Sequence, residues 1–323
     1  MNEKLSKILE KIYTNVKHPN GLSSPRRLWD AAKKYGITLK ECRDYLESQD
    51  SYTLHKLMPK RFPRRHIIAS GPRRILTSDL ADLTKLARFN GGVKYLLIVQ
   101  DVFSRYVRII PQKRKTAIVT AENLDKIFSE EQFKGVGAFF TDEGTEYFNA
   151  ECRKIYKKYK IKHYTTFNKA TKAALVERYI KNLKSKIFRY LTHNNTKRYI
   201  DVLDHITNAY NTQTHSSLHD TPANVHFHYD KPKIYALYQR LYGTHKRHTH
   251  RRKLPIKVND VVRLTSYKRD LIFNKAYEVA ATVEKFRVVK IDKKQFPEVY
   301  YVRDMQNQPI IGSFYKQELI RTL

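Results

Sequence analysis

The sequence predicts an α/β core with a mixed sheet and helices on both of its faces. A helical domain precedes this core and a small β-barrel follows it. Three observations support the prediction. Apolar residues recur at helical spacing through about the first 70 residues. From residue 73, short apolar strands alternate with amphipathic helices, and beyond residue 255 the pattern becomes short β-runs separated by turns.

Residues 1–72 are expected to form a helical DNA-binding domain and an arm. Pro25 suits the first position of a helix, and Gly36 suits its end. Thr38 and Glu41 have the spacing of a capping box that opens the next helix. This pattern is equally typical of a helix-turn-helix DNA reader and of an ordinary helical hairpin.

Residues 73–230 contain the elements of the predicted core. Three strands come first, "RRILTSDLADL", "VKYLLIVQDV" and "RYVRIIP", followed by the helix "TAIVTAENLDKIFSEE". The strand "GAFFTD", the helix "NAECRKIYKKYK", the short strand "IKHYT" and a long helix over about residues 173–191 come next. Residues 231–254 are expected to add a helix and a basic linker, and 255–323 an SH3-like or chromo-like barrel that binds DNA.

The charge of the chain indicates a polyanionic partner. Lysine and arginine number 63 against 31 aspartates and glutamates, which gives a net charge of +32. Nucleic acid is the default partner for such a chain, and charge alone leaves structural RNA open as well as DNA. The longest strongly apolar run, residues 95–99, is too short to span a bilayer, so no membrane partner is expected. Two cysteines make no disulfide framework, which indicates a reducing compartment.

Carboxylates at strand ends are the candidate chemical groups. Asp142 directly follows the apolar run "AFFT", and Asp79 and Asp82 lie within the first strand, where a lone buried carboxylate is costly. Glu177 borders the apolar stripe of the long helix. For an isolated helix, a surface row of ion pairs with nearby lysines would explain Glu177 better.

If the first and fourth strands are neighbours, Asp79, Asp142 and Glu177 converge. Three such carboxylates raise one another's pKa values, and a divalent cation relieves their repulsion. Oxygen ligands select magnesium or manganese. Two such ions can clamp the attacking and leaving oxygens of a phosphodiester. The interpretation is a site with two metal ions that acts on nucleic acid.

Together these motifs resemble the retroviral integrase superfamily, whose core has a ribonuclease H-like fold and a D,D,E triad. Glu177 follows Asp142 by 35 positions, close to the spacing of that family. Within the superfamily the chain is most similar to integrases of Maverick/Polinton elements, through "YLESQDSYTLHK" and "YKRDLIFNKAYE". The stretches that match the superfamily are "SDLADL", "KYLLIVQDVFSRYVRIIP", "TDEGTEYF", "KAALVERYIKNLK" and "AYNTQTHSSL".

The resemblance implies an enzyme that trims the 3′ ends of element DNA and then joins them to target DNA, without a covalent enzyme intermediate. Asp79, Asp142 and Glu177 would be the catalytic residues and would hold two Mg²⁺ or Mn²⁺ ions. Lys181 and Lys184 match positions that contact phosphate. Further DNA contacts are expected from the basic linker, at Lys246, Arg247, Arg251 and Arg252.

The implied partners are element-end DNA, target DNA and further copies of the chain, as a dimer or tetramer on DNA. The implied place of action is the nucleus, or a virus-like particle on the way to it. An alternative is a domesticated or inactive integrase-derived protein that binds DNA without cutting it, although all three acids are present. A nuclease acting on RNA–DNA hybrids shares the fold, but the helical front domain and the β-rich tail disfavour it.

The amino-terminal region departs from the family. Retroviral integrases carry a His2Cys2 zinc module there, whereas the first 70 residues of this chain hold one cysteine and the chain has no C-x-x-C. No zinc site is therefore expected. The domain should fold instead on its apolar residues, namely Leu28, Trp29, Tyr35, Ile37, Leu39 and Leu46.

Asp79 is preferred to Asp82 as the first metal ligand. Positions three apart on a regular strand face opposite sides, so only one of them can face the site. Leu76 stands three before Asp79, as an apolar or aromatic residue does in the family. Asp82 lies near the end of the strand, where a hydrogen bond to the turn is expected. Asp101 is likewise expected to form a hydrogen-bonded turn, and Glu146 to face solvent in one.

Overall fold

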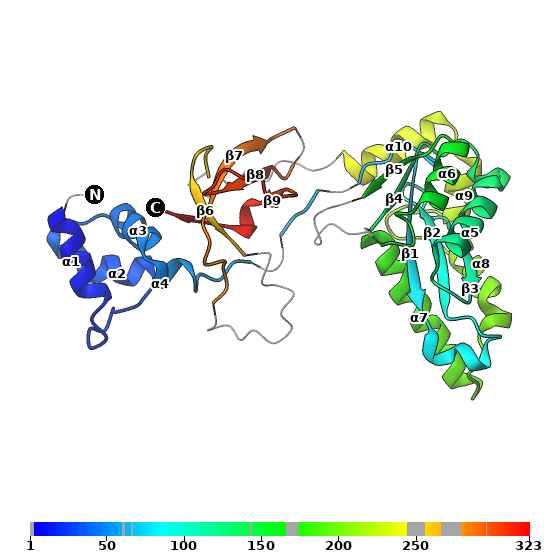
Figure 1. Ribbon diagram of the computed structural model, residues 1–323, viewed down its shortest axis with the longest axis horizontal. Coiled ribbons are helices and arrows are strands. Elements are labelled where there is room, and N and C mark those ends of the chain that lie inside the picture. The colour runs from blue at the N-terminus through cyan, green and yellow to red at the C-terminus, as the bar shows by residue number, and fades with distance from the viewer. Residues whose placement is uncertain are drawn as a thin grey trace. The chain divides into compact units, whose positions relative to one another are not determined.

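The computed structural model describes residues 3–59, 62–65, 67–142, 144–165, 174–243, 256–265, 279–294 and 296–323. The chain divides into two compact units (Figure 1). Unit 1 comprises Met1–Arg65 and Arg251–Leu323, and unit 2 comprises His66–His250.

Unit 2 is built on a mixed five-stranded sheet with the strand order β3-β2-β1-β4-β5. The first three strands are antiparallel neighbours, whereas β4 runs parallel to β1 and β5 parallel to β4. The expected neighbourhood of the first and fourth strands is therefore confirmed. The strands are β1 (Ile75–Asp82), β2 (Tyr95–Asp101), β3 (Val107–Gln112), β4 (Ala138–Thr141) and β5 (Lys162–Thr165).

Helices cover both faces of this sheet, as predicted (Figure 1). Side chains of β2 alternate between the faces: Leu96 and Ile98 pack in the cluster that contains α7, and Leu97 and Val99 in the cluster that contains α5 and α6. This double burial explains why β2 reads as a continuous apolar run. The helices are α5 (Ala117–Ser129), α6 (Ala150–Lys158), α7 (Ala174–His193), α8 (Leu203–Thr212), α9 (Pro222–His228) and α10 (Lys231–Tyr242).

A smaller apolar cluster attaches α10 to this core. Leu237 of α10 is buried beside Phe103, Leu218 and Val225, and Ala69 joins them from the segment before β1. The helix expected in the linker region thus packs on the core rather than standing apart from it.

The N-terminal helices of unit 1 surround an apolar core. Thr38 and Glu41 form the predicted capping box, and Gly36 ends the preceding short helix at φ +76°, a conformation that favours glycine. Leu28, Ile37 and Leu46 are buried as predicted, but Tyr35 is half exposed, so its assignment to the core is wrong. The helices are α1 (Glu3–Tyr13), α2 (Pro25–Ala32), α3 (Leu39–Ser48) and α4 (Asp50–Thr53).

The rest of unit 1 is a five-stranded antiparallel sheet with the order β10-β6-β7-β8-β9. Its curved face encloses a core that includes Val262, Val288 and Tyr300. This sheet is consistent with the small β-domain that the sequence predicts. The strands are β6 (Val261–Leu264), β7 (Phe286–Asp292), β8 (Val299–Asp304), β9 (Phe314–Tyr315) and β10 (Leu319–Thr322).

Contacts between the two ends of the chain join the helices and the sheet of unit 1. The guanidinium of Arg263 in β6, only 1% exposed, donates hydrogen bonds to Asp50 Oδ1 at 2.6 Å and Thr53 Oγ1 at 3.2 Å in α4. The backbone N–H of Leu323 donates to the carbonyl of Glu47 at 3.0 Å. The two regions therefore share one interface, although about 210 residues separate them.

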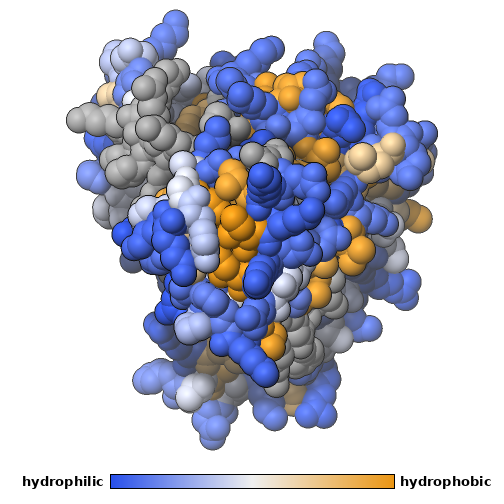
Figure 2. All heavy atoms as spheres, turned by 90° about the vertical axis from the view of Figure 1, so that its left-hand side faces the viewer, coloured by the Kyte–Doolittle hydropathy of each residue, from blue (hydrophilic) through white to orange (hydrophobic). Residues whose placement is uncertain are grey.

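The face of the molecule in Figure 2 is mainly hydrophilic, with apolar residues confined to patches. Among the described residues, no helix combines the length and the apolar character needed to cross a bilayer.

Candidate active site

Asp79 lies in β1, the central strand of the unit 2 sheet, and is half-buried. Its Oδ1 accepts a hydrogen bond from the backbone N–H of Leu80 at 2.7 Å. Burial raises the pKa of Asp79 to about 6, and the charges of Asp142, Glu177 and Glu146 contribute to the rise. The structure thus brings Asp79 within electrostatic range of three other carboxylates.

Asp142 directly follows β4. The parallel pairing of Leu76 with Phe139 and of Thr77 with Phe140, continued by two residues, brings Asp142 opposite Asp79. Its Oδ1 accepts a hydrogen bond from the N–H of Gly144 at 3.1 Å, which closes a tight turn. The two aspartates therefore lie next to each other on the sheet, because β1 and β4 are parallel neighbours.

Glu177 comes from α7. Val176, Tyr179 and Leu183 of this helix are buried against β1 and β2, and Glu177 lies exposed beside them, as its place in the helical pattern predicts. One turn later Lys181 is exposed on the same face.

Asp82 has a different environment from Asp79. It is exposed, and its Oδ1 accepts a hydrogen bond from the N–H of Thr84 at 2.8 Å. This bond lowers the pKa of Asp82, and the nearby ammonium of Lys184 contributes. The predicted hydrogen bond of Asp82 to the turn is confirmed.

Asp101 also forms the turn that the sequence predicts. The fully buried carboxylate accepts hydrogen bonds from the backbone N–H groups of Phe103 and Ser104, both at 2.8 Å, and of Arg73 at 2.5 Å. Because three backbone N–H groups already donate to this carboxylate, its role is structural.

The four expected DNA contacts of the linker, Lys246, Arg247, Arg251 and Arg252, lie outside the described residues.

Glu146 differs from its prediction. The solvent-facing role expected for it is wrong, because its side chain is only 5% exposed and its Oε1 lies 2.9 Å from Nζ of Lys115. Lys115 belongs to the connection between β3 and α5. No periodic pattern marks a loop residue as buried, so the sequence held no signal for this ion pair.

A hydrogen bond between Tyr147 and Ser78 connects the segment after Asp142 to the sheet. The ring of Tyr147 is fully buried, and its hydroxyl lies 2.9 Å from the hydroxyl of Ser78, which also donates to the carbonyl of Ile98 at 2.8 Å. Ser78 immediately precedes Asp79. The positions of the two aspartates are therefore linked through side chains as well as through the sheet.

The chemistry of the site fits a hard divalent cation. The converging side chains offer only carboxylate oxygens. Burial is the main cause of the raised pKa of Asp79, the charges of the neighbouring carboxylates add to it, and a bound cation would offset both effects. Within the described ranges, however, no group of three or more His, Cys, Asp or Glu side chains is already close enough together to hold an ion.

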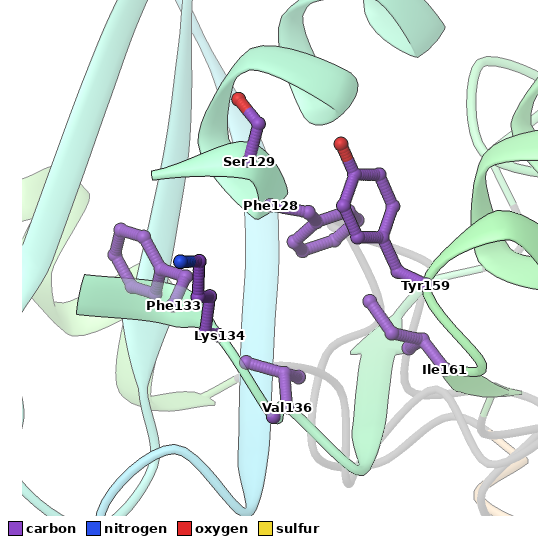
Figure 3. Close-up of a pocket in the computed structure, with 8 residues that line it drawn as sticks. Phe128, Ser129, Phe133, Lys134, Val136, Tyr159 and Ile161 are labelled. Carbon is purple, nitrogen blue, oxygen red and sulfur yellow. The ribbon is translucent and has the colours of Figure 1, made fainter. Parts of the chain in front are cut away.

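A cavity of about 280 Å³ lies elsewhere in unit 2, between the ends of α5 and α6 and the start of β5 (Figure 3). Phe128, Phe133, Tyr159 and Ile161 provide most of its apolar wall, and no carboxylate lines it. Its lining contains no histidine, cysteine or carboxylate that could bind a metal ion. A second cavity of about 510 Å³ joins the arginines 73 and 74 to aromatic residues of α9 and α10.

Comparisons with known proteins agree with the geometry of unit 2. Residues 72–168 match the family model of the integrase core domain. A transposon-derived protein of Caenorhabditis elegans is 27% identical over 143 residues, which are 44% of this chain and 49% of that protein. The chain spans about half the length of this curated relative.

A solved structure shows the same fold. A chain of the simian T-cell lymphotropic virus intasome, solved in complex with PP2A regulatory subunit B56 gamma, aligns with a TM-score of 0.62 at 16% identity, over 93% of this chain and 99% of that one. The HTLV-2 integrase catalytic core domain, solved in complex with magnesium, aligns over 48% of this chain and 97% of that one at 21% identity, with a TM-score of 0.39. The core has a ribonuclease H-like integrase fold.

Proposed function

We propose that this protein is the integrase of a mobile genetic element, which trims the 3′ ends of element DNA and inserts them into target DNA. The observation that carries the proposal is the meeting of Asp79 and Asp142 on neighbouring parallel strands, within electrostatic range of Glu177 on α7. The integrase core match over residues 72–168 supports it.

Asp79, Asp142 and Glu177 are the residues that would hold two magnesium or manganese ions. Bound there, the ions would activate the attacking oxygen and stabilise the leaving oxygen of a phosphodiester. The chain itself supplies the fixed carboxylates, and Lys181 and Lys184 on α7 bind and orient the DNA phosphates near them. The nucleophiles are water and then the 3′-hydroxyl of DNA, so no protein nucleophile is required.

The proposed substrates are element-end DNA and target DNA. The +32 charge supplies the attraction to both, and the intasome neighbour supports assembly of several copies on DNA. We assign the element to the Maverick/Polinton class, the C-terminal sheet to the SH3-like barrels that bind DNA, and the place of action to the nucleus.

A second candidate is an inactive, domesticated descendant that binds DNA without cutting it. The observation in its favour is that the described carboxylates are not already gathered at ion-holding distances. Such a descendant would keep the proposed DNA binding and would not trim or join DNA ends.

A strand-transfer assay separates these two functions. Oligonucleotides with the terminal sequence of the encoding element are incubated with the full chain, a supercoiled plasmid and Mg²⁺. Joined product that disappears on addition of EDTA, and in Asp142→Asn, supports the integrase. Binding of DNA without joined product supports the inactive descendant.

A further inference from the structure

Lys115 and Glu146 form an ion pair at the edge of the carboxylate site. Nζ of Lys115 lies 2.9 Å from Oε1 of Glu146, whose side chain is 5% exposed, while that of Lys115 is 46% exposed. The charges of Asp142 and Asp79 contribute to raising the pKa of Lys115, after the hydrogen bond to Glu146 as the first cause. The pair is therefore close to both aspartates, although the function proposed above uses neither member.

Gly144 shapes the space that Glu146 occupies. A Cβ atom at Gly144 would lie 2.6 Å from the carboxylate carbon of Glu146. The carboxylate thus folds back across the backbone of the segment that begins at Asp142. A side chain at this position would force the Glu146 carboxylate to shift from its place beside Lys115.

The two ends of the pair belong to different loops. Glu146 stands between Asp142 and Tyr147, in the segment fastened to Ser78 of β1. Lys115 stands between β3 and α5. The segment after Asp142 is consequently held at two points, by a hydrogen bond on one side and by the ion pair on the other.

We propose that Lys115 and Glu146 are positioning residues of the metal site: their ion pair holds the segment after Asp142 against the β3–α5 connection and so sets where the Asp142 carboxylate lies relative to Asp79. The inference rests on the proposed function and adds two residues to its machinery. Partners that orient metal ligands commonly change metal affinity about 10- to 100-fold when they are removed.

Two other roles predict opposite signs for the two residues. If Glu146 were itself a metal ligand, loss of Glu146 would weaken metal binding. Loss of Lys115 would free the Glu146 carboxylate and would strengthen metal binding. If the pair acted only through charge, loss of the lysine would strengthen cation binding and loss of the glutamate would weaken it. Of the three roles, only positioning predicts that loss of Lys115 and loss of Glu146 both weaken metal binding, because either loss breaks the same ion pair.

The test is a calorimetric titration of the full chain with Mn²⁺, without DNA. Wild type, Lys115→Met, Glu146→Gln and the double variant are compared, with Asp142→Asn as the reference for a lost ligand. We expect each single variant to bind Mn²⁺ about 10-fold more weakly, and the double variant no more weakly than either. Unchanged affinity in both single variants, or changes of opposite sign, would overturn the proposal.

Matched controls separate local positioning from global charge and from misfolding. Lys154→Met and Glu151→Gln remove the members of an exposed pair on α6, also 2.9 Å apart, and should leave Mn²⁺ affinity unchanged. Gly144→Ala should reproduce the loss seen in Glu146→Gln, and equal melting temperatures establish that the variants are folded. If wild type binds Mn²⁺ no better than Asp142→Asn, the metal site itself is refuted, a result distinct from failure of the ion pair.

Discussion

The hydroxyl of Tyr147 lies 2.9 Å from the hydroxyl of Ser78, so the segment after Asp142 is fastened to β1 one residue before Asp79. Tyr147→Phe removes this bond and keeps the buried ring. We expect a loss of about 1 kcal/mol in the free energy of unfolding, measured by denaturant titration. Strand transfer should fall by more than this loss of stability explains, because the two aspartates lose a shared support. Full activity in the folded variant would contradict this role for the hydroxyl.

The two aspartates of β1 should behave differently. Asp79→Asn keeps the size of the side chain and removes the charge that would hold a cation, so strand transfer on pre-trimmed ends should be abolished while DNA binding remains. Asp82→Asn loses only a carboxylate that accepts the N–H of Thr84, and should stay active. If Asp82→Asn is inactive and Asp79→Asn is active, the first catalytic acid is Asp82, three residues after Asp79.

The pKa of Asp79 predicts how stability depends on pH in metal-free protein. In the folded chain it is raised to about 6 from the usual 3.8, so this residue favours folding while it is protonated. That contribution is fully present below about pH 4 and is lost as the pH rises through about 6. In EDTA at pH 7, Asp79→Asn should therefore be more stable than wild type, by up to about 3 kcal/mol, and near pH 4 the difference should vanish.

Thermal melts at both pH values check this prediction. Added Mg²⁺ should stabilise wild type and leave Asp79→Asn unchanged. Asp82→Asn serves as the control, because its pKa is lowered rather than raised and its removal should give no gain in stability. Equal melting temperatures for wild type and Asp79→Asn at pH 7 in EDTA would contradict the destabilising effect of the buried Asp79 charge.

Local patterns predicted single elements both of the core that carries the site and of the N-terminal helices. The apolar run of β2, the capping box at Thr38 and the stripe of α7 each follow from spacing along the chain. The family resemblance added that the first and fourth strands are neighbours, and together these observations predicted that Asp79, Asp142 and Glu177 converge.

Features that depend on contacts between distant segments could not be predicted from the sequence. The burial of Glu146 depends on Lys115, 31 positions earlier, and no period connects two loops. Beyond residue 255 the sequence indicated β-runs at "DVVRLT", "KFRVVKID", "VYYVRD" and "PIIGSFY". The short strand β10 was missed because its pairing with β6 spans about 55 residues. Tyr35 was expected in the core because it is aromatic, yet it lies beside the glycine that ends its helix and is half exposed.

The buried guanidinium of Arg263 predicts that the two ends of the chain unfold together. Arg263→Met keeps the apolar stem but removes hydrogen bonds to Asp50, Thr53 and the carbonyl of Thr282. We expect unit 1 to lose about 1–3 kcal/mol of stability, because the hydrogen bonds of a buried guanidinium are lost and the buried hydroxyl of Thr53 loses this donor. Chemical denaturation followed by circular dichroism measures this loss. Arg287→Met, on an exposed position of β7, should change little.

The lysines of α7 should control how DNA binding depends on salt. Lys181 is exposed one turn after Glu177, and Lys184 is half-buried near Asp82, so both lysines lie on the helix that carries Glu177. Each phosphate contact that is lost should reduce the slope of log affinity against log salt by about 0.9. Lys181→Ala and Lys184→Ala should therefore each flatten the slope by about one unit, across DNA sequences alike.

The control for this measurement is Lys126→Ala, which removes the same charge from α5 on the opposite face of the sheet. Fluorescence anisotropy with one duplex at several salt concentrations gives each slope. If Lys126→Ala flattens the slope as much as the α7 variants do, the contribution of α7 is only that of net charge. If the α7 variants alone flatten it, DNA phosphates lie on the face of the core that carries Glu177.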